Sequence, residues 1–170
     1  MGCWQINIQC YGCGAFVDNI EGQPHKYIGT IQGCWNIYEQ VLTKEYEDYS
    51  YFEDIHRLTV DTYAIQHPGQ PCKQSIQSVN LHLIGLYYVL IKNLSGKEAT
   101  KKIGAILEKK PKFEWLEPPI PNGQITIINV LIATNKEYHE KIVKEWAQDV
   151  FGCWLLKHRQ AIEKIVKNNF

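Results

Sequence analysis

The sequence predicts a mainly α-helical protein: a single-domain helical bundle with a short N-terminal strand and a zinc-knuckle-like CxxC turn. Apolar residues recur at helical spacing over most of the chain. Ser/Thr-x-x-Glu sequences, which form capping boxes at helix N-termini, occur at three places. A Cys-x-x-Cys-Gly sequence follows a short alternating segment near the N-terminus. With 170 residues, the chain is long enough to bury one core without disulfides, so we expect one domain spanning residues 1–170.

Composition narrows the classes of function. The 18 basic and 18 acidic side chains cancel, and no long run of one charge occurs, so no nucleic-acid binding is predicted. No segment has the apolar length of a membrane span, and the N-terminus does not read as a signal peptide, so we expect a cytoplasmic protein without membrane contact. Thiols stay reduced in that compartment. The six cysteines are therefore expected to be metal ligands or buried residues.

The first segment, residues 1–32, is expected to hold the knuckle and a loop. Residues 4–9 alternate apolar and polar side chains, which predicts a short strand. Cys10 and Cys13 follow it, and Gly14 allows the chain to turn so that backbone amides point toward the thiolates. Residues 18–32 contain Gly and Pro and predict a loop with an exposed His25.

Residues 33–110 are expected to form helical hairpins. The first helix runs from Gly33 to about residue 49, and the second starts at the capping box that begins with Ser50 and ends with Glu53. His67 stands before a Pro-Gly pair, which ends the second helix because a residue before proline disfavours the helical conformation. A third helix spans about residues 75–93, and a capping box beginning with Ser95 opens a basic fourth helix.

Residues 111–125 contain four prolines and predict an irregular connector. Residues 126–170 are expected to hold the C-terminal helices. Thr126 is placed to cap a short helix through Ile132, although the same apolar run could form a buried strand. A capping box beginning with Thr134 is expected to start the last helix, which has one apolar face.

Helix lengths place a possible metal site. If the first two helices form an antiparallel hairpin that turns near Ser50, Cys34 and His67 lie at the same end of it. A knuckle folded onto that end would supply Cys10 and Cys13. Three thiolates and an imidazole are the ligands of a closed, four-coordinate structural Zn²⁺ site. Cys72 is the alternative fourth ligand, and redox chemistry is the alternative use of a Cys-x-x-Cys pair.

A second group of polar residues lies further along the helices, away from the expected metal site. His56 and His82 are expected to face similar levels of the bundle, with Tyr63 and Ser78 nearby. The two histidines could act as general base and orienter, could bind a second metal, or could simply be hydrogen-bonded core residues. Asp61 is expected to face outward as the partner of Arg57, four residues before it.

Several of these segments resemble an uncharacterised bacterial family, a domain of unknown function. The resemblance rests on the run from His56 to Gly69, on the QSV and LHL sequences that follow it, on Cys10 to Gly14, on Gly33-Cys-Trp before a helix that ends in Glu45-Tyr, and on Trp146-Ala. It implies one domain in which the knuckle belongs with the bundle, and it implies no activity. Members often carry two adjacent histidines late in the last helix, where this chain has Lys157 and His158.

Three functions remain open from the sequence. The first is a zinc-stabilised module, with the metal structural, that binds a small ligand or a protein partner. The second is a metal-containing enzyme, for example a hydrolase, that uses the pocket of His56 and His82. The third is a thiol redox or metal-sensing protein. A nucleophile elbow, a P-loop, an HExxH sequence and a dinucleotide fingerprint are all missing from the sequence, which disfavours the familiar enzyme classes.

Overall fold

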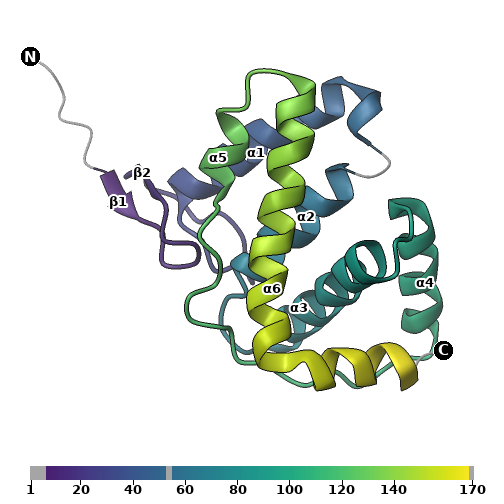
Figure 1. Cartoon of the computed structure of the whole chain (residues 1–170). Coiled ribbons are helices and arrows are strands. Elements are labelled where there is room, and N and C mark those ends of the chain that lie inside the picture. Colours follow the sequence, from purple (N-terminus) through teal and green to yellow (C-terminus); the bar gives the residue numbers. More distant parts are fainter. Residues whose placement is uncertain (1–6, 53–54, 169–170) are drawn as a thin grey trace, which may run out of the picture.

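The computed structural model describes residues 7–52 and 55–168 and confirms the mainly α-helical class. Within those ranges a two-stranded hairpin lies at one edge of a group of helices (Figure 1). The strands are β1 (Asn7–Gln9) and β2 (Phe16–Asp18). The helices are α1 (Gln32–Glu47), α2 (Ile55–Gln66), α3 (Lys73–Leu86), α4 (Gly96–Glu108), α5 (Ile127–Leu131) and α6 (Lys136–Asn168). A 3₁₀ turn, Tyr49–Tyr51, precedes α2, and a π-helical segment, Tyr87–Ile91, follows α3.

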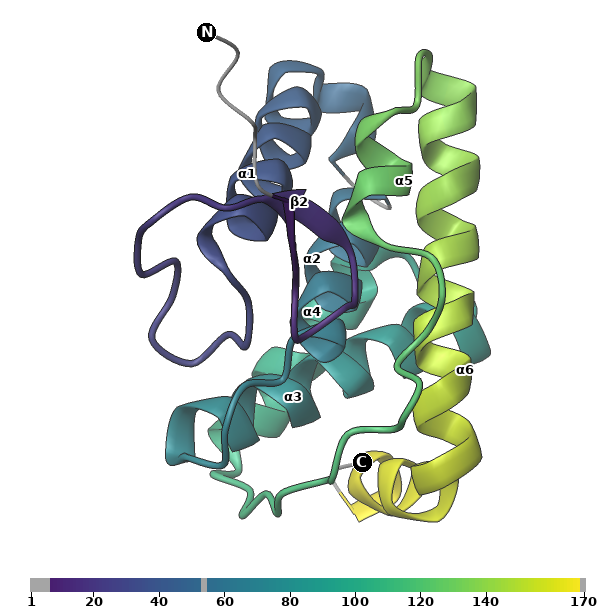
Figure 2. The same cartoon turned by 90° about the vertical axis from the view of Figure 1, so that its left-hand side faces the viewer.

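The hairpin is antiparallel, with Gln9 opposite Phe16. It contains residues 7–9 of the strand expected over residues 4–9, and residues 4–6 lie outside the described part. The loop that follows β2 stands away from the helices before the chain enters α1 (Figure 2). His25 is exposed in this loop, as the sequence predicts.

Helix α2 is the central element, packed between α3 and α6 (Figure 1). Most of its side chains are buried, in agreement with apolar residues that point in many directions around it. Two tryptophans of α6 hold its C-terminal end. Trp154 Nε1 donates to the carbonyl of Ile65 at 3.1 Å, and Trp146 Nε1 donates to Gln66 Oε1 at 3.0 Å. These bonds satisfy buried polar groups and fix the end of α2 from which His67 projects.

The observed helix starts match some of the predicted capping residues and differ from others. The capping box of Ser95 and Glu98 opens α4 as predicted. Ser50, in contrast, does not start the second helix. The Asp48 carboxylate accepts from the backbone N–H of Ser50 and caps the 3₁₀ turn, and Glu53 lies outside the described residues. The prediction for Thr134 is also wrong by one position, because Asn135 Oδ1 accepts the N–H of Tyr138.

The connector over residues 111–125 is irregular, as its prolines predict. The segment after Thr126 is helical, so the alternative of a buried strand is wrong. Thr126 and Asn129 form a reciprocal cap there, and the Asp149 carboxylate of α6 accepts the backbone N–H groups of residues 124 and 125. These contacts lay α5 alongside α6 (Figure 2). The dihedral angles of His158 break the helical geometry of α6, which bends there.

Candidate functional site

The Cys-x-x-Cys turn closes the N-terminal hairpin. Cys10 directly follows β1, and its N–H donates to the carbonyl of Ala15 at 2.8 Å while Gly14 N donates back to the carbonyl of Cys10 at 2.8 Å. Gly14 has φ +78°, a conformation that favours glycine. Gly12 packs directly against the ring of His67, so a side chain at that position would collide with the ring. The turn therefore holds both thiols against the end of α2.

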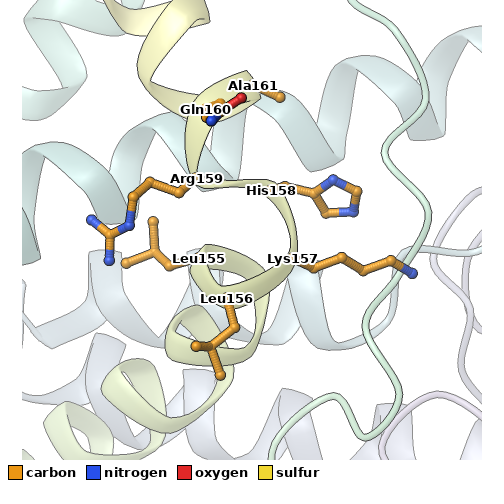
Figure 3. Close-up of a pocket in the computed structure, with 7 residues that line it drawn as sticks. All are labelled: Leu155, Leu156, Lys157, His158, Arg159, Gln160 and Ala161. Carbon is orange, nitrogen blue, oxygen red and sulfur yellow. The ribbon is translucent and has the colours of Figure 1, made fainter.

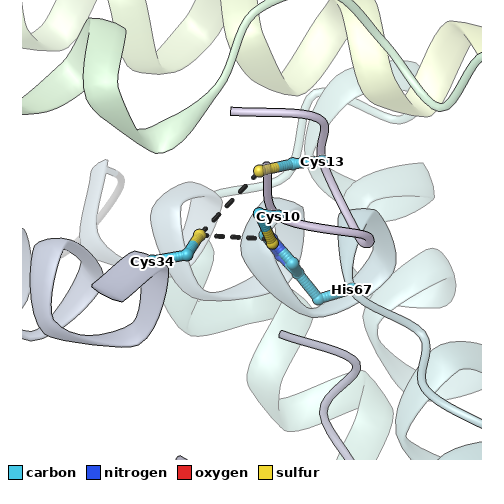
Figure 4. A group of neighbouring side chains, drawn as sticks. All are labelled: Cys10, Cys13, Cys34 and His67. Carbon is cyan, nitrogen blue, oxygen red and sulfur yellow. Dashed lines mark hydrogen bonds between the residues drawn. The ribbon is translucent and has the colours of Figure 1, made fainter. Parts of the chain in front are cut away.

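The two central helices bring their own ligands to the same place. Cys34 lies in the first turn of α1, and His67 directly follows α2. Together with Cys10 and Cys13 they form a group in which all four ligand atoms lie within 4.8 Å of one another (Figure 4). Three segments that are far apart in the sequence therefore meet at one cluster, which could bind a metal ion.

Distances within the cluster fit tetrahedral coordination. The Sγ atoms of Cys13 and Cys34 are 3.8 Å apart, and Cys34 Sγ lies 3.5 Å from His67 Nε2 (Figure 4). With Zn–S bonds of about 2.3 Å and Zn–N bonds of about 2.0 Å, a tetrahedron places two sulfurs about 3.8 Å apart and a sulfur and a nitrogen about 3.5 Å apart. A disulfide requires about 2.05 Å between sulfurs, so the observed spacing suits ligands of a shared ion.

A backbone hydrogen bond orients the His67 ring. Its Nδ1 lies 2.8 Å from the carbonyl of Tyr63, so Nδ1 carries the proton and donates. This leaves Nε2 with its lone pair facing the thiols, the arrangement that metal-binding histidines use. Cys72, the alternative ligand, is exposed. Its Sγ accepts the N–H of Ser75 at the start of α3, and it is not part of the cluster.

The pKa shifts of the cluster residues favour a bound cation. A hydrogen bond with Cys13 lowers the pKa of the Cys10 thiol, whereas the hydrogen bond with Cys10 raises the pKa of Cys13, because two adjacent thiolates repel. Burial alone would lower the pKa of His67, but hydrogen bonds with Cys10 and Cys34 raise it to about 9. A divalent cation would displace the proton of His67 Nε2 and would stabilise the Cys10 and Cys13 thiolates together.

Tyr63 belongs to this cluster and not to the cavity of His56 and His82, so its predicted place beside that pair is wrong. Its hydroxyl donates to Cys34 Sγ at 3.5 Å and lies 3.0 Å from Thr30 Oγ1. The ring stacks on Tyr38 at 3.9 Å between centroids. Burial is the main cause that raises the pKa of the Tyr63 hydroxyl, so it remains a donor to the sulfur.

His56 and His82 both line a second cavity, of about 520 Å³. Tyr63 and Ser78 are not among its lining residues. Asp61 also lines it, and the expectation that this carboxylate faces outward is wrong, since it is 1% exposed. Its Oδ1 accepts from His82 Nδ1 at 2.7 Å and its Oδ2 accepts from Arg57 Nε at 2.6 Å. The predicted pairing with Arg57 is present, but the pair lies against the neighbouring helix rather than on the surface.

Neither Glu45 nor His139 is predicted as a site residue from the sequence. Glu45 is fully buried, where its carboxylate accepts from His56 Nδ1 at 2.9 Å, His139 Nε2 at 2.9 Å and Thr59 Oγ1 at 2.6 Å. Burial would raise the pKa of Glu45, but these hydrogen bonds, that of His139 first, lower it. Helical spacing carried a signal, because Glu45 lies four residues after the buried Val41 and so falls on the apolar face of α1.

A hollow of about 560 Å³ surrounds the bend of α6 (Figure 3). Two polar side chains of the hollow bind the irregular connector over residues 111–125. His158 Nε2 donates to the carbonyl of Glu117 at 2.7 Å, and Lys157 Nζ donates to the carbonyl of Pro118 at 2.9 Å. The His158 ring also packs beside Trp154, with 5.8 Å between ring centroids. These contacts account for both side chains structurally.

The fold and the cluster define a mainly helical protein with a candidate Cys₃His metal centre. A family model, described as a family of unknown function (DUF5946), matches residues 8–155, and the chain belongs to that family. The match confirms the resemblance found in the sequence. No curated protein and no solved structure matches the chain. Among the helices of the described ranges, none has the length and apolar character to cross a bilayer.

Proposed function

We propose that Cys10, Cys13, Cys34 and His67 bind one structural Zn²⁺ ion and that the helical bundle built on this centre binds a small ligand. The observation that carries the metal proposal is that four ligand atoms lie within 4.8 Å of one another, with one sulfur–sulfur and one sulfur–nitrogen separation that match the edges of a zinc tetrahedron. Four protein ligands fill every position of a tetrahedral ion. No position is left for water, which is why the role is structural rather than catalytic.

The position of the centre supports a stabilising role. It would join the N-terminal hairpin, the start of α1 and the end of α2. Next to it, the backbone N–H of Gly29, in the loop before α1, donates to the carbonyl of His67. Zinc binding to such a preorganised set contributes directly to folding stability. The proposal requires reduced thiols, as in the cytoplasm, where we place the protein.

Elemental analysis tests the metal. Protein purified without added metal should carry about one zinc per chain, and the double variant Cys10→Ser/Cys13→Ser should lose both the metal and thermal stability. Cys72→Ser is the matched control, because this exposed thiol lies outside the cluster and its loss should change neither quantity. Metal-free wild type with the same melting temperature as zinc-loaded protein would refute the structural centre, and stoichiometric iron would refute the choice of zinc.

A hydrolytic or related enzyme is the second candidate function. It is favoured by the two histidines that open on one cavity, each oriented through Nδ1 by a buried carboxylate, Glu45 for His56 and Asp61 for His82. Such an orientation prepares the opposite ring nitrogen for general acid–base work. A His82→Ala protein that folds and binds ligand normally and turns over every substrate of the wild type would exclude this role.

Thiol redox or metal sensing is the third candidate, and Cys13 favours it because it is the least buried of the three thiols. Alkylation decides between this function and a structural centre. Zinc-loaded wild type should resist iodoacetamide at Cys13 and react only after chelation, if the metal is structural. Rapid labelling of Cys13 with zinc still bound would support the sensing function.

A further inference from the structure

The cavity of His56 and His82 lies where the start of α2, the middle of α3 and the start of α4 meet. Its volume of about 520 Å³ is in the range of small-molecule sites, roughly 300–1,000 Å³. The lining residues are Tyr49, Phe52, His56, Arg57, Val60, Asp61, His82, Gly96, Lys97 and Thr100. They divide into a group of hydrogen-bond donors and a group of aromatic side chains.

Charge in the lining favours an anion. Arg57 and Lys97 are cationic, and Asp61 is the one acidic residue among the described residues that line the cavity. Both carboxylate oxygens of Asp61 already accept strong hydrogen bonds, one from Arg57 and one from His82. Its charge is therefore compensated within the wall, and Lys97 is left as a cation without a carboxylate of the lining to pair with.

The two imidazole rings present equivalent edges to the cavity. In both His56 and His82, Nδ1 faces a buried carboxylate, which leaves Nε2 as the nitrogen available to a ligand. Thr100, whose Oγ1 accepts from Arg57 Nη1 at 3.1 Å, holds the guanidinium at the same wall. The cationic groups of Arg57 and Lys97 therefore meet at the cavity from α2 and α4.

An aromatic stack forms the opposite side. The rings of Tyr49 and Phe52 are nearly parallel, 7° apart with centroids at 5.8 Å. Phe52 in turn lies parallel to His56, at 5° and 5.2 Å. Tyr49 is 77% exposed and Phe52 is 41% exposed, so the faces of both rings are accessible to a planar group of a ligand. The stack leads from the surface to the histidine edge of the cavity.

We propose that this cavity binds a phosphorylated compound with a planar heteroaromatic ring, of the chemistry of a nucleoside monophosphate. The phosphate is held by Lys97 and Arg57, and the ring stacks on Tyr49 and Phe52. The inference rests on the small-ligand part of the proposed function and is independent of the zinc centre.

Isothermal titration of the zinc-loaded full-length protein with the 5′-monophosphates of adenosine, guanosine, cytidine and uridine tests the proposal. At least one nucleotide should bind about tenfold more tightly than its nucleoside and about tenfold more tightly than ribose 5-phosphate or inorganic phosphate. Absence of binding by all four nucleotides at millimolar concentration would overturn the proposal. Equal affinity for nucleoside and nucleotide would show that the cavity binds a ligand but not its phosphate, and would overturn that part of the proposal. Equal affinity for inorganic phosphate and nucleotide would overturn the stacking of the ring on Tyr49 and Phe52.

Two exposed positions separate the contributions without threatening the fold. Lys97→Ala should weaken the nucleotide about threefold to fivefold and leave nucleoside binding unchanged, because it removes one partly solvated charge contact. Tyr49→Ala should reduce nucleotide binding and leave phosphate binding unchanged. Lys144→Ala, an exposed lysine of α6 away from the cavity, is the matched control and should have no effect. Equal effects of Lys97→Ala and Lys144→Ala would refute the assignment.

Discussion

Replacing Glu45 with glutamine tests the most connected buried charge of the described structure. The carboxylate is fully buried and accepts from His56 through one oxygen and from Thr59 and His139 through the other. Glutamine keeps one acceptor oxygen and turns an NH₂ group toward the remaining donor. Hydrogen bonds to a charged group contribute about 1.5–3 kcal/mol each, so we expect a loss of about 3 kcal/mol in the free energy of unfolding.

Thermal and urea denaturation followed by circular dichroism measure this loss. For a chain of this size, 1 kcal/mol corresponds to about 2–4 °C, so the melting temperature should fall by about 6–12 °C. Glu47→Gln is the matched control, because Glu47 is exposed near the end of the same helix and should change stability by less than about 0.5 kcal/mol. Indistinguishable melting temperatures for the Glu45→Gln and Glu47→Gln proteins would refute the reasoning.

Dependence on pH provides a second check of the Glu45 network. Burial opposes ionisation, but the hydrogen bonds of His139, His56 and Thr59 outweigh it and set the folded pKa of Glu45 below the ordinary glutamate value of 4.5. A lowered folded pKa means that the stabilisation is complete above about pH 4.5 and is lost as the pH falls through the folded value. The stability difference between wild type and Glu45→Gln should therefore shrink in acid. A difference that persists unchanged to about pH 2 would contradict this assignment.

Two further predictions concern the frame that carries the metal centre. Gly12→Ala should lower zinc occupancy and melting temperature, because its Cβ would collide with the His67 ring. Gly104→Ala, in open space on α4, should instead raise the free energy of unfolding by about 0.5–1 kcal/mol, because alanine favours the helix over glycine. Equal effects of the two variants would contradict the packing. Gln66→Leu should cost about 3 kcal/mol in urea denaturation, since it leaves the indole N–H of Trp146 and two carbonyls of the connector without partners. A neutral effect would show that these groups find other partners.

Local features of the sequence predict most of the helix boundaries in the fold. Capping residues such as Ser95, the proline after His67 and the prolines of the connector act within a few residues of themselves, so the sequence indicates these boundaries directly. Where two neighbouring residues can both cap, as Thr134 and Asn135 can, propensity alone does not choose, and the start of α6 was misplaced by one residue.

Part of the candidate metal centre was also accessible from the sequence. Helix lengths on either side of a turn place Cys34 and His67 at one end of a hairpin, because the rise per residue of a helix is constant. The chemistry of the Cys-x-x-Cys pair then indicates zinc. The structure supplies the spacing of the ligand atoms, the exclusion of Cys72 from the cluster and the hydrogen bond from Tyr63 to Cys34, none of which follows from spacing along the chain.

The sequence by itself determined the helical class, the helix ends with strong local signals and a Cys-rich set of ligand candidates in which His67 and Cys72 competed for the fourth position. Only the tertiary structure decided which polar residues are buried. Arg57 and Asp61 have the spacing of a surface ion pair, yet α3 packs over Asp61 and brings His82 to it. Glu45 and His139 are separated by most of the chain and meet only because α6 folds back against α1 and α2. Burial depends on which element packs against a helix face, and the sequence of one helix does not show which element that is.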